Sequence, residues 1–196
     1  MRAVTYQGPN QVKVAEVEDA KLEKKDDIVI KITSTAICGS DLHLYQGSMP
    51  LPHGYIIGHE PMGIVEEVGP DVTKVKKGDR VIIPFNVACG QCAYCKDDLT
   101  SQCDNSNPHY DSGGYFGYTE KFGNHPGGQA EYLKVPFGNF TPFVIPVMPK
   151  LYDQIVKGEF DPKEIITHKV ALEDAVDAYK IFNDHQDNCI KVILKP

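Results

Sequence analysis

Short runs of alternating and β-branched residues dominate the first part of the chain. Residues 12–17 alternate apolar and polar side chains, which is the period of a half-buried strand, and 28–32 is a more apolar, β-branched run. Further runs at 63–69, 80–84 and 130–135 border on glycine or proline. Many short strands separated by turns, with no helical period, predict a mainly β structure built as a barrel or sandwich.

The pattern becomes helical near Pro146. Apolar residues at helical spacing in 151–156 predict one helix, and the Asp-Pro pair at 161–162 is a typical helix start. Residues 172–182 carry one apolar face of an amphipathic helix, and 189–194 has the pattern of a strand. The end of the chain is therefore predicted to hold C-terminal helices and a closing strand.

These patterns predict the domain organisation. We expect a β domain over residues 1–146 and a C-terminal segment, 147–196, packed on the same domain. With 196 residues, 41% of them hydrophobic and 24% charged, the composition is that of a globular protein. The stretch 104–128 is rich in Gly, Asn, His and Tyr without a period, and such loops on a β scaffold often line a site.

Charge and hydropathy narrow the range of partners. Lys and Arg number 20 against 27 Asp and Glu, and this net charge of −7 disfavours binding to nucleic acid or to anionic lipid. No stretch approaches the roughly 20 apolar residues of a membrane span, and the N-terminus lacks the apolar core of a secretory signal. We therefore expect a cytoplasmic protein with neither nucleic-acid nor membrane partners.

Four of the six cysteines lie close together in the sequence. Cys89, Cys92, Cys95 and Cys103 have the spacing C-x2-C-x2-C-x7-C. Short C-x2-C turns bring thiolates to about 2.3 Å from one zinc ion, and a closed shell of four leaves no open position for substrate. The spacing predicts a structural zinc lobe over about 86–106. Reduced, packed cysteines and an iron–sulfur cluster are the alternative interpretations.

A second set of residues has the chemistry of an open metal site. Cys38 follows a buried strand, and His59 comes some twenty residues later. A thiolate and an imidazole supply two zinc ligands, and Glu60 or a later residue could supply the third. Three protein ligands and one open position are typical of catalytic zinc. The alternative interpretation is a packed cysteine and a packed histidine.

Polar neighbours of these two ligands suit proton transfer. Ser40 and His43 offer a hydroxyl and an imidazole close to Cys38 in the sequence. Asp41 could orient the ring of His59 by accepting its N–H. We therefore assign Ser40, Asp41 and His43 as candidate catalytic residues.

Several motifs together resemble the zinc-containing medium-chain alcohol dehydrogenases, in particular the formaldehyde-dehydrogenase-like branch. They are Cys-Gly-Ser-Asp at 38–41, Gly-His-Glu at 58–60, Gly-Asp-Arg-Val at 78–81, Gly-Gly-Gln-Ala-Glu-Tyr at 127–132 and the four-cysteine lobe. The C-terminal part, from 161 to 192, is also similar to the closing segment of that family. The resemblance covers nearly the whole chain.

The resemblance implies a GroES-like β-barrel catalytic domain with two zinc ions, one structural and one catalytic. Cys38 and His59 would hold the catalytic ion, and Asp41 would support His59. Ser40 would take the proton of a small alcohol, and His43 would pass it to solvent. Zinc would lower the pKa of the alcohol, and hydride would then pass to NAD.

The chain departs from the family pattern at the third zinc ligand. Similar proteins carry an acidic residue after a Val-Pro-Phe turn, whereas Gly138 and Asn139 follow 135–137 here. An amide oxygen is a weaker, neutral ligand. We expect either weak ligation by Asn139 or recruitment of Glu60 into the site.

The nucleotide domain is the second departure. The family places a Rossmann domain between two segments that meet here near 144–149, but only 50 residues follow Pro146 and no G-x-G-x-x-G occurs. We expect the nucleotide-binding domain to be absent and hydride transfer to be weak or missing, because the protein itself supplies no hydride acceptor.

The alternative functions are a weak zinc-dependent hydrolase and a non-enzymatic zinc-stabilised module. The uncovered domain face is expected to expose apolar side chains and to favour a homo-oligomer.

Overall fold

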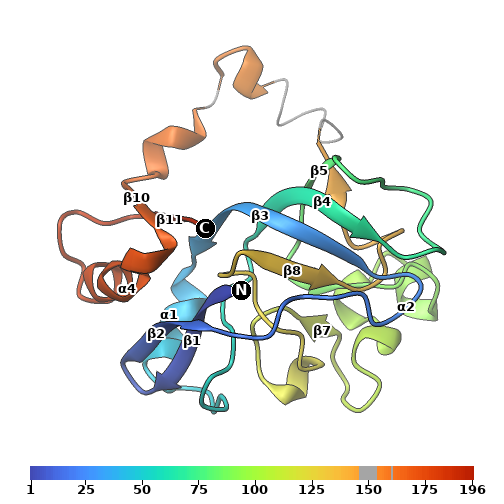
Figure 1. The fold of residues 1–196 in the computed structure, drawn as a ribbon, viewed down its shortest axis with the longest axis horizontal. Helices are drawn as coiled ribbons and strands as arrows, with labels where there is room; N and C mark the ends of the chain where they lie inside the picture. The colour runs from blue at the N-terminus through green and yellow to red at the C-terminus, as the bar shows by residue number, and fades with distance from the viewer. Residues whose placement is uncertain (146–153, 160) are drawn as a thin grey trace.

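The central element of the fold is one long strand, β3 (Ile28–Ile37) (Figure 1). The structure is a computed structural model that describes residues 1–145, 154–159 and 161–196. One edge of β3 pairs with β4 along most of its length. The other edge pairs with β8 at residues 28–31, and β11 pairs with residues 35–37 near the end of β3. Strands from the middle and from the end of the chain thus both pair with β3.

Seven of the described strands form this sheet in the order β10-β11-β3-β4-β5-β9, with β8 also pairing with β3. All pairs are antiparallel except β10 with β11. The strands besides β3 are β4 (Met62–Val68), β5 (Arg80–Ile82), β8 (Tyr132–Val135), β9 (Phe143–Val144), β10 (His168–Ala171) and β11 (Val192–Lys195).

Two small two-stranded sheets and several short helices complete the described structure. The hairpins are β1 (Arg2–Gly8) with β2 (Gln11–Glu16), and β6 (Asn86–Val87) with β7 (Gly114–Tyr115). The α-helices are α1 (Gly39–Tyr45), α2 (Ala93–Lys96) and α4 (Ala175–Asn183). The 3-10 turns are η1 (Thr100–Gln102), η2 (Asp104–Ser106), η3 (Glu120–Phe122), η4 (Pro162–Ile165) and η5 (Leu172–Asp174).

Two apolar cores hold these elements together. The first lies between α4, α1 and the β1–β2 hairpin, and Tyr45, Leu172 and Tyr179 are among its buried members. The second lies inside the sheet, where β3, β4 and β8 contribute Ile30, Val65 and Leu133. The first core attaches the C-terminal helix to the elements that surround α1.

The predicted mainly β fold is confirmed, and all five strands predicted before Pro146 form at or near the expected positions. The predicted helix over 172–182 begins with the 3-10 turn η5, and the closing strand begins at Val192. Asp161 caps η4 by accepting a hydrogen bond from the backbone N–H of Lys163 at 2.9 Å.

The predicted domain boundary at residue 146 and the first half of the helix predicted over 151–156 lie outside the described residues. Residues 154–156 are helical, and the six residues 154–159 are all exposed. The part of the chain that the structure describes contains no doubly wound α/β sheet of the kind that binds dinucleotides. None of its helices has the length and apolar character needed to span a bilayer.

Candidate metal centres

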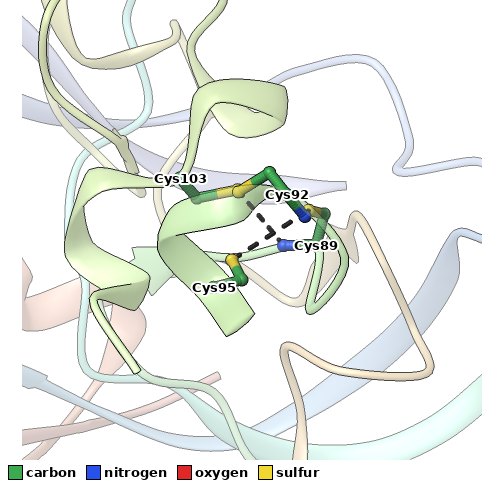
Figure 2. Close-up of side chains that lie close together, drawn as sticks. All are labelled: Cys89, Cys92, Cys95 and Cys103. Atoms are coloured by element: carbon green, nitrogen blue, oxygen red, sulfur yellow. Dashed lines mark hydrogen bonds between the residues drawn. The ribbon is translucent and has the colours of Figure 1, made fainter. Parts of the chain in front are cut away.

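The four clustered cysteines converge on one point, although they come from separate short elements. Cys89 follows β6, Cys92 precedes α2, Cys95 lies within α2, and Cys103 lies between η1 and η2. Figure 2 shows their sulfur atoms gathered in a small space. All four are free thiols, so this lobe is not held by a disulfide.

The sulfur positions match a tetrahedral ion. Sγ of Cys89 lies 4.0 Å from Sγ of Cys95, and Sγ of Cys92 lies 3.9 Å from Sγ of Cys103. A zinc ion bound at about 2.3 Å to four sulfurs sets an edge of about 3.8 Å between them. The donor set therefore fits a closed four-thiolate site.

Backbone and amide N–H groups surround these sulfurs. Sγ of Cys89 accepts from the backbone N–H of Gln91 and of Cys92 at 3.3 Å, and from the Asn105 side chain at 3.2 Å. Sγ of Cys103 accepts from the backbone N–H of Cys89 at 3.3 Å. Because N–H donors stabilise thiolate more than thiol, the lobe is prepared for negative charge.

The protons on these thiols oppose metal binding to different degrees. Burial raises the pKa of Cys95 to about 12, and burial also raises the pKa of Cys103. At Cys92, burial acts in the same direction, but hydrogen bonds from the backbone and side chain of Cys95 outweigh it and bring the pKa to about 7. A metal ion must displace these protons, so its binding releases protons to solvent.

A second group of ligand atoms lies where β3 ends. Cys38 is the residue before α1, and its Sγ, a ring nitrogen of His59 and a carboxylate oxygen of Glu60 all lie within 4.8 Å of one another. The three side chains line a cavity of about 470 Å³. Three ligands facing a cavity leave an open position for a further molecule, as in catalytic metal sites.

Asp41 lies beside the His59 ring and orients it in this second site. Its carboxylate is fully buried, and Oδ1 lies 3.1 Å from Nδ1 of His59, which is a salt-bridge distance. Burial lowers the pKa of His59, but Asp41, and to a smaller degree Cys38, more than reverse this and raise it to about 9. The arrangement directs Nδ1 toward Asp41 and leaves Nε2 for other partners.

The two predicted proton-transfer residues lie in different places. Oγ of Ser40 is 3.3 Å from Sγ of Cys38 and 3.1 Å from Nε2 of His59, so Ser40 belongs to the site. His43 is exposed on α1 and does not line the cavity. The structure thus brings Ser40 to the candidate ligands but not the side chain of His43.

The prediction that Asn139 could ligate the same ion is wrong. Asn139 Oδ1 accepts from the backbone N–H of Thr73 at 2.7 Å and of Lys74 at 3.0 Å, and its Nδ2 donates to the Asp71 carbonyl. The neighbouring strand β8 pairs with the beginning of β3, whereas Cys38 follows its end. A ten-residue strand separates the two by about 30 Å.

Two further residues at the cavity have no counterpart in the sequence predictions. Lys191 contacts Glu60 with its ammonium group, and the ring of Tyr118 lies 5.3 Å from the ring of His59. Lys191 lies 131 positions from Glu60, and no local spacing signals such a contact. Two segments that are far apart in the sequence therefore meet at this site.

Comparison with protein families identifies the fold around these sites. Residues 24–147 match the family described as the alcohol dehydrogenase GroES-like domain. The chain belongs to this family. An uncharacterized zinc-type alcohol dehydrogenase-like protein, AdhB, of Bacillus subtilis is 65% identical over 147 residues, or 74% of this chain and 39% of that protein. The predicted family and GroES-like fold are thereby confirmed.

Other members of the alcohol dehydrogenase group give a consistent picture. A glutathione-independent formaldehyde dehydrogenase of Pseudomonas aeruginosa is 40% identical over 151 residues, covering 74% of this chain and 37% of that protein. The chain therefore spans less than half the length of these curated relatives.

Solved structures agree with this assignment. Zinc-dependent alcohol dehydrogenase 2 from Streptococcus pneumonia is 31% identical, with a TM-score of 0.63 over 93% of this chain and 52% of that chain. Alcohol dehydrogenase TADH from Thermus sp. ATN1 is 21% identical with a TM-score of 0.88, covering 100% of this chain and 99% of that chain. At that identity the second match shows the fold alone.

Proposed function

We propose that this chain is the metal-binding catalytic part of a zinc-dependent alcohol or aldehyde dehydrogenase. The observation that supports it most is the meeting of Cys38, His59 and Glu60 around one point of a 470 Å³ cavity. These residues would hold the catalytic zinc ion, and the four-cysteine lobe would hold a structural one. The family match and the zinc-type relatives agree with this assignment.

The residues around the cavity suit a small alcohol or aldehyde. A bound zinc ion would supply a Lewis acid that polarises the substrate oxygen and lowers the pKa of an alcohol. Ser40 is placed to exchange the hydroxyl proton, since its Oγ touches both Cys38 and His59. Met62 and Ile82 line the cavity and give a substrate carbon an apolar surface. The proposed substrate class is therefore a small alcohol or aldehyde.

The described residues offer no binding site for a hydride acceptor. The reaction needs NAD as the hydride acceptor, and the described residues form no dinucleotide-binding sheet. We therefore propose that this chain by itself transfers hydride weakly or not at all.

Its six free cysteines favour a reducing compartment such as the cytoplasm. The predicted homo-oligomer stays a prediction; the exposed rings of Phe85 and Phe143 favour it.

Zinc analysis of three proteins tests the proposal. We expect two zinc ions in the wild type, one in Cys38→Ala and one in Cys92→Ala, measured by elemental analysis after gel filtration. A wild type with a single ion, or a Cys38→Ala protein that keeps both, contradicts the assignment. Oxidation of short alcohols or formaldehyde with NAD at ordinary rates by the wild type would contradict the proposal about hydride transfer.

A further inference from the structure

A buried chain of hydrogen bonds runs from helix α4 to Asp41, and the other carboxylate oxygen of Asp41 lies at salt-bridge distance from the ring of the candidate zinc ligand His59. This chain of hydrogen bonds passes through Tyr179, Gln129 and Asp41, each fully buried. We infer that Tyr179 and Gln129 are positioning residues, which orient Asp41 and through it the His59 ring for metal binding. This inference rests on the proposed function, because it assigns His59 to the catalytic ion.

The hydrogen bonds link three segments that are far apart in the sequence. The Tyr179 hydroxyl donates to Oε1 of Gln129 at 2.9 Å. Nε2 of Gln129 donates to the Ala36 carbonyl at 3.2 Å and to Oδ2 of Asp41 at 3.3 Å. Every polar atom of the Gln129 amide therefore has a partner inside the protein, as buried polar groups require.

The Tyr179 hydroxyl determines which way the Gln129 amide points. In the observed orientation, both acceptors, the Ala36 carbonyl and the Asp41 carboxylate, face the NH2 group. A flipped amide would place its oxygen against these two oxygens and leave its own NH2 group opposite the tyrosine hydroxyl. Donation by Tyr179 thus stabilises the one orientation in which Gln129 can support Asp41.

Gln129 in turn determines which carboxylate oxygen of Asp41 meets the histidine. Oδ2 accepts from Gln129 and, at 2.9 Å, from the backbone N–H of Cys38. Oδ1 is left facing Nδ1 of His59 at 3.1 Å. An N–H group held at Nδ1 directs the Nε2 lone pair outward, which is the form of the ring that ligates a metal.

The backbone beside His59 is shaped to receive the Gln129 side chain. Gly58 has φ +96°, and a Cβ atom there would lie 2.3 Å from Cγ of Gln129. The Gln129 side chain therefore packs directly against the peptide that precedes His59. Gln129 thus packs against Gly58, the residue before the histidine, and donates a hydrogen bond to Asp41, the carboxylate that faces the histidine ring. Its hydrogen bond from Tyr179 connects both contacts to α4.

Site-resolved zinc affinity tests the inference. Zinc is titrated against a competing chelator in wild type, Tyr179→Phe, Gln129→Met and Tyr45→Phe. Tyr45→Phe is the matched control, since the Tyr45 ring lies 5.3 Å from the Tyr179 ring in the same core and makes no contact with the Gln129 amide. Loss of a group that orients a metal ligand costs about 10–100-fold in affinity.

We expect Tyr179→Phe to weaken the Cys38–His59 site about tenfold and Gln129→Met at least as much, while Tyr45→Phe leaves it unchanged. The four-cysteine site should keep wild-type affinity in all variants and serves as an internal control. A second readout is the 15N spectrum of the His59 imidazole. Its tautomer ratio should change in Tyr179→Phe and Gln129→Met but not in Tyr45→Phe.

The outcomes separate two kinds of failure. If the wild type binds zinc only at the four cysteines, the proposed function fails, and the imidazole spectra still decide whether Tyr179 orients His59. If the wild type binds two ions but Tyr179→Phe and Gln129→Met match Tyr45→Phe in affinity and tautomer ratio, the inference is overturned. If Tyr179→Phe shows no cooperative unfolding in urea and is therefore not folded, the zinc affinity and tautomer ratio of Gln129→Met are compared with those of Tyr45→Phe instead.

Discussion

Lys191 and Glu60 form an ion pair at the edge of the cavity that also holds Cys38 and His59. Their side chains are 23% and 35% exposed, so the pair is only partly shielded from water. A carboxylate that ligates a metal must share its negative charge with any cation beside it. If Glu60 ligates the proposed zinc ion, Lys191 competes with that ion for the carboxylate.

Replacing Lys191 by Ala should strengthen metal retention. The Glu60 carboxylate loses its competing cation, and a partly exposed ion pair contributes up to about 1 kcal/mol, so zinc release into a chelator should slow by up to about fivefold at low salt. The difference should shrink at high salt because exposed charges are screened. Lys180→Ala, which removes an exposed pair with Asp177, is the control. Faster release from Lys191→Ala would contradict the competition.

Local signals in the sequence predict part of the molecule well. Alternating runs such as 12–17 and β-branched runs such as 28–32 predict strands that the structure contains. The four-cysteine lobe could also be found, since its cysteines lie within 15 residues and their spacing is itself the geometric signal.

Contacts that depend on strand order could not be found in this way. Asn139 was misplaced because its position relative to Cys38 is decided by the register of β8 on β3, which no local pattern encodes. Lys191 and Tyr179 reach the second site through the pairing of β11 and the packing of α4. Each comes from a segment more than a hundred positions away, so only the folded chain reveals it.

Removing a cysteine of the lobe should release one zinc ion and destabilise the domain. Without Cys92, the remaining thiols cannot close a tetrahedral shell, and structural zinc sites contribute directly to folding free energy. We expect Cys92→Ser to lose one equivalent of zinc and to unfold at a clearly lower urea concentration. Cys189→Ser is the matched control, because Cys189 is buried but lies outside the cluster. Equal zinc loss from both variants would argue against the lobe.

Gly58 should tolerate substitution much less than Gly78. Both have strongly positive φ, +96° and +93°, so alanine is strained at either position. A Cβ atom at Gly78 meets nothing within 4 Å, whereas at Gly58 it overlaps Gln129. We expect Gly78→Ala to cost about 1–2 kcal/mol and Gly58→Ala about 2–5 kcal/mol, measured by urea unfolding. An equal loss of unfolding free energy in the two variants would show that the overlap with Gln129 does not destabilise the protein.

The ring of His125 should make stability depend on pH. Its Nε2 lies 2.9 Å from the Ser106 carbonyl, where a neutral ring donates its N–H. Burial lowers the pKa of His125 below its ordinary 6.5, and the charges of Lys134 and Lys24 act in the same direction. The unfolded chain therefore binds a proton at a higher pH than the folded one does. The stabilisation is present above about pH 6.5 and is lost as the pH falls below it.

Urea unfolding of wild type and His125→Asn at pH 7.5 and 5.5 measures this contribution. We expect the wild-type midpoint to fall on acidification by more than that of His125→Asn, because only the wild type holds this partly buried neutral ring. Acid also protonates the thiols of the four-cysteine lobe, but it does so equally in both proteins, so the difference between them isolates His125. His53→Asn, which removes an exposed histidine, should retain the full wild-type pH dependence. If His125→Asn retains it as well, the acid sensitivity arises elsewhere in the fold.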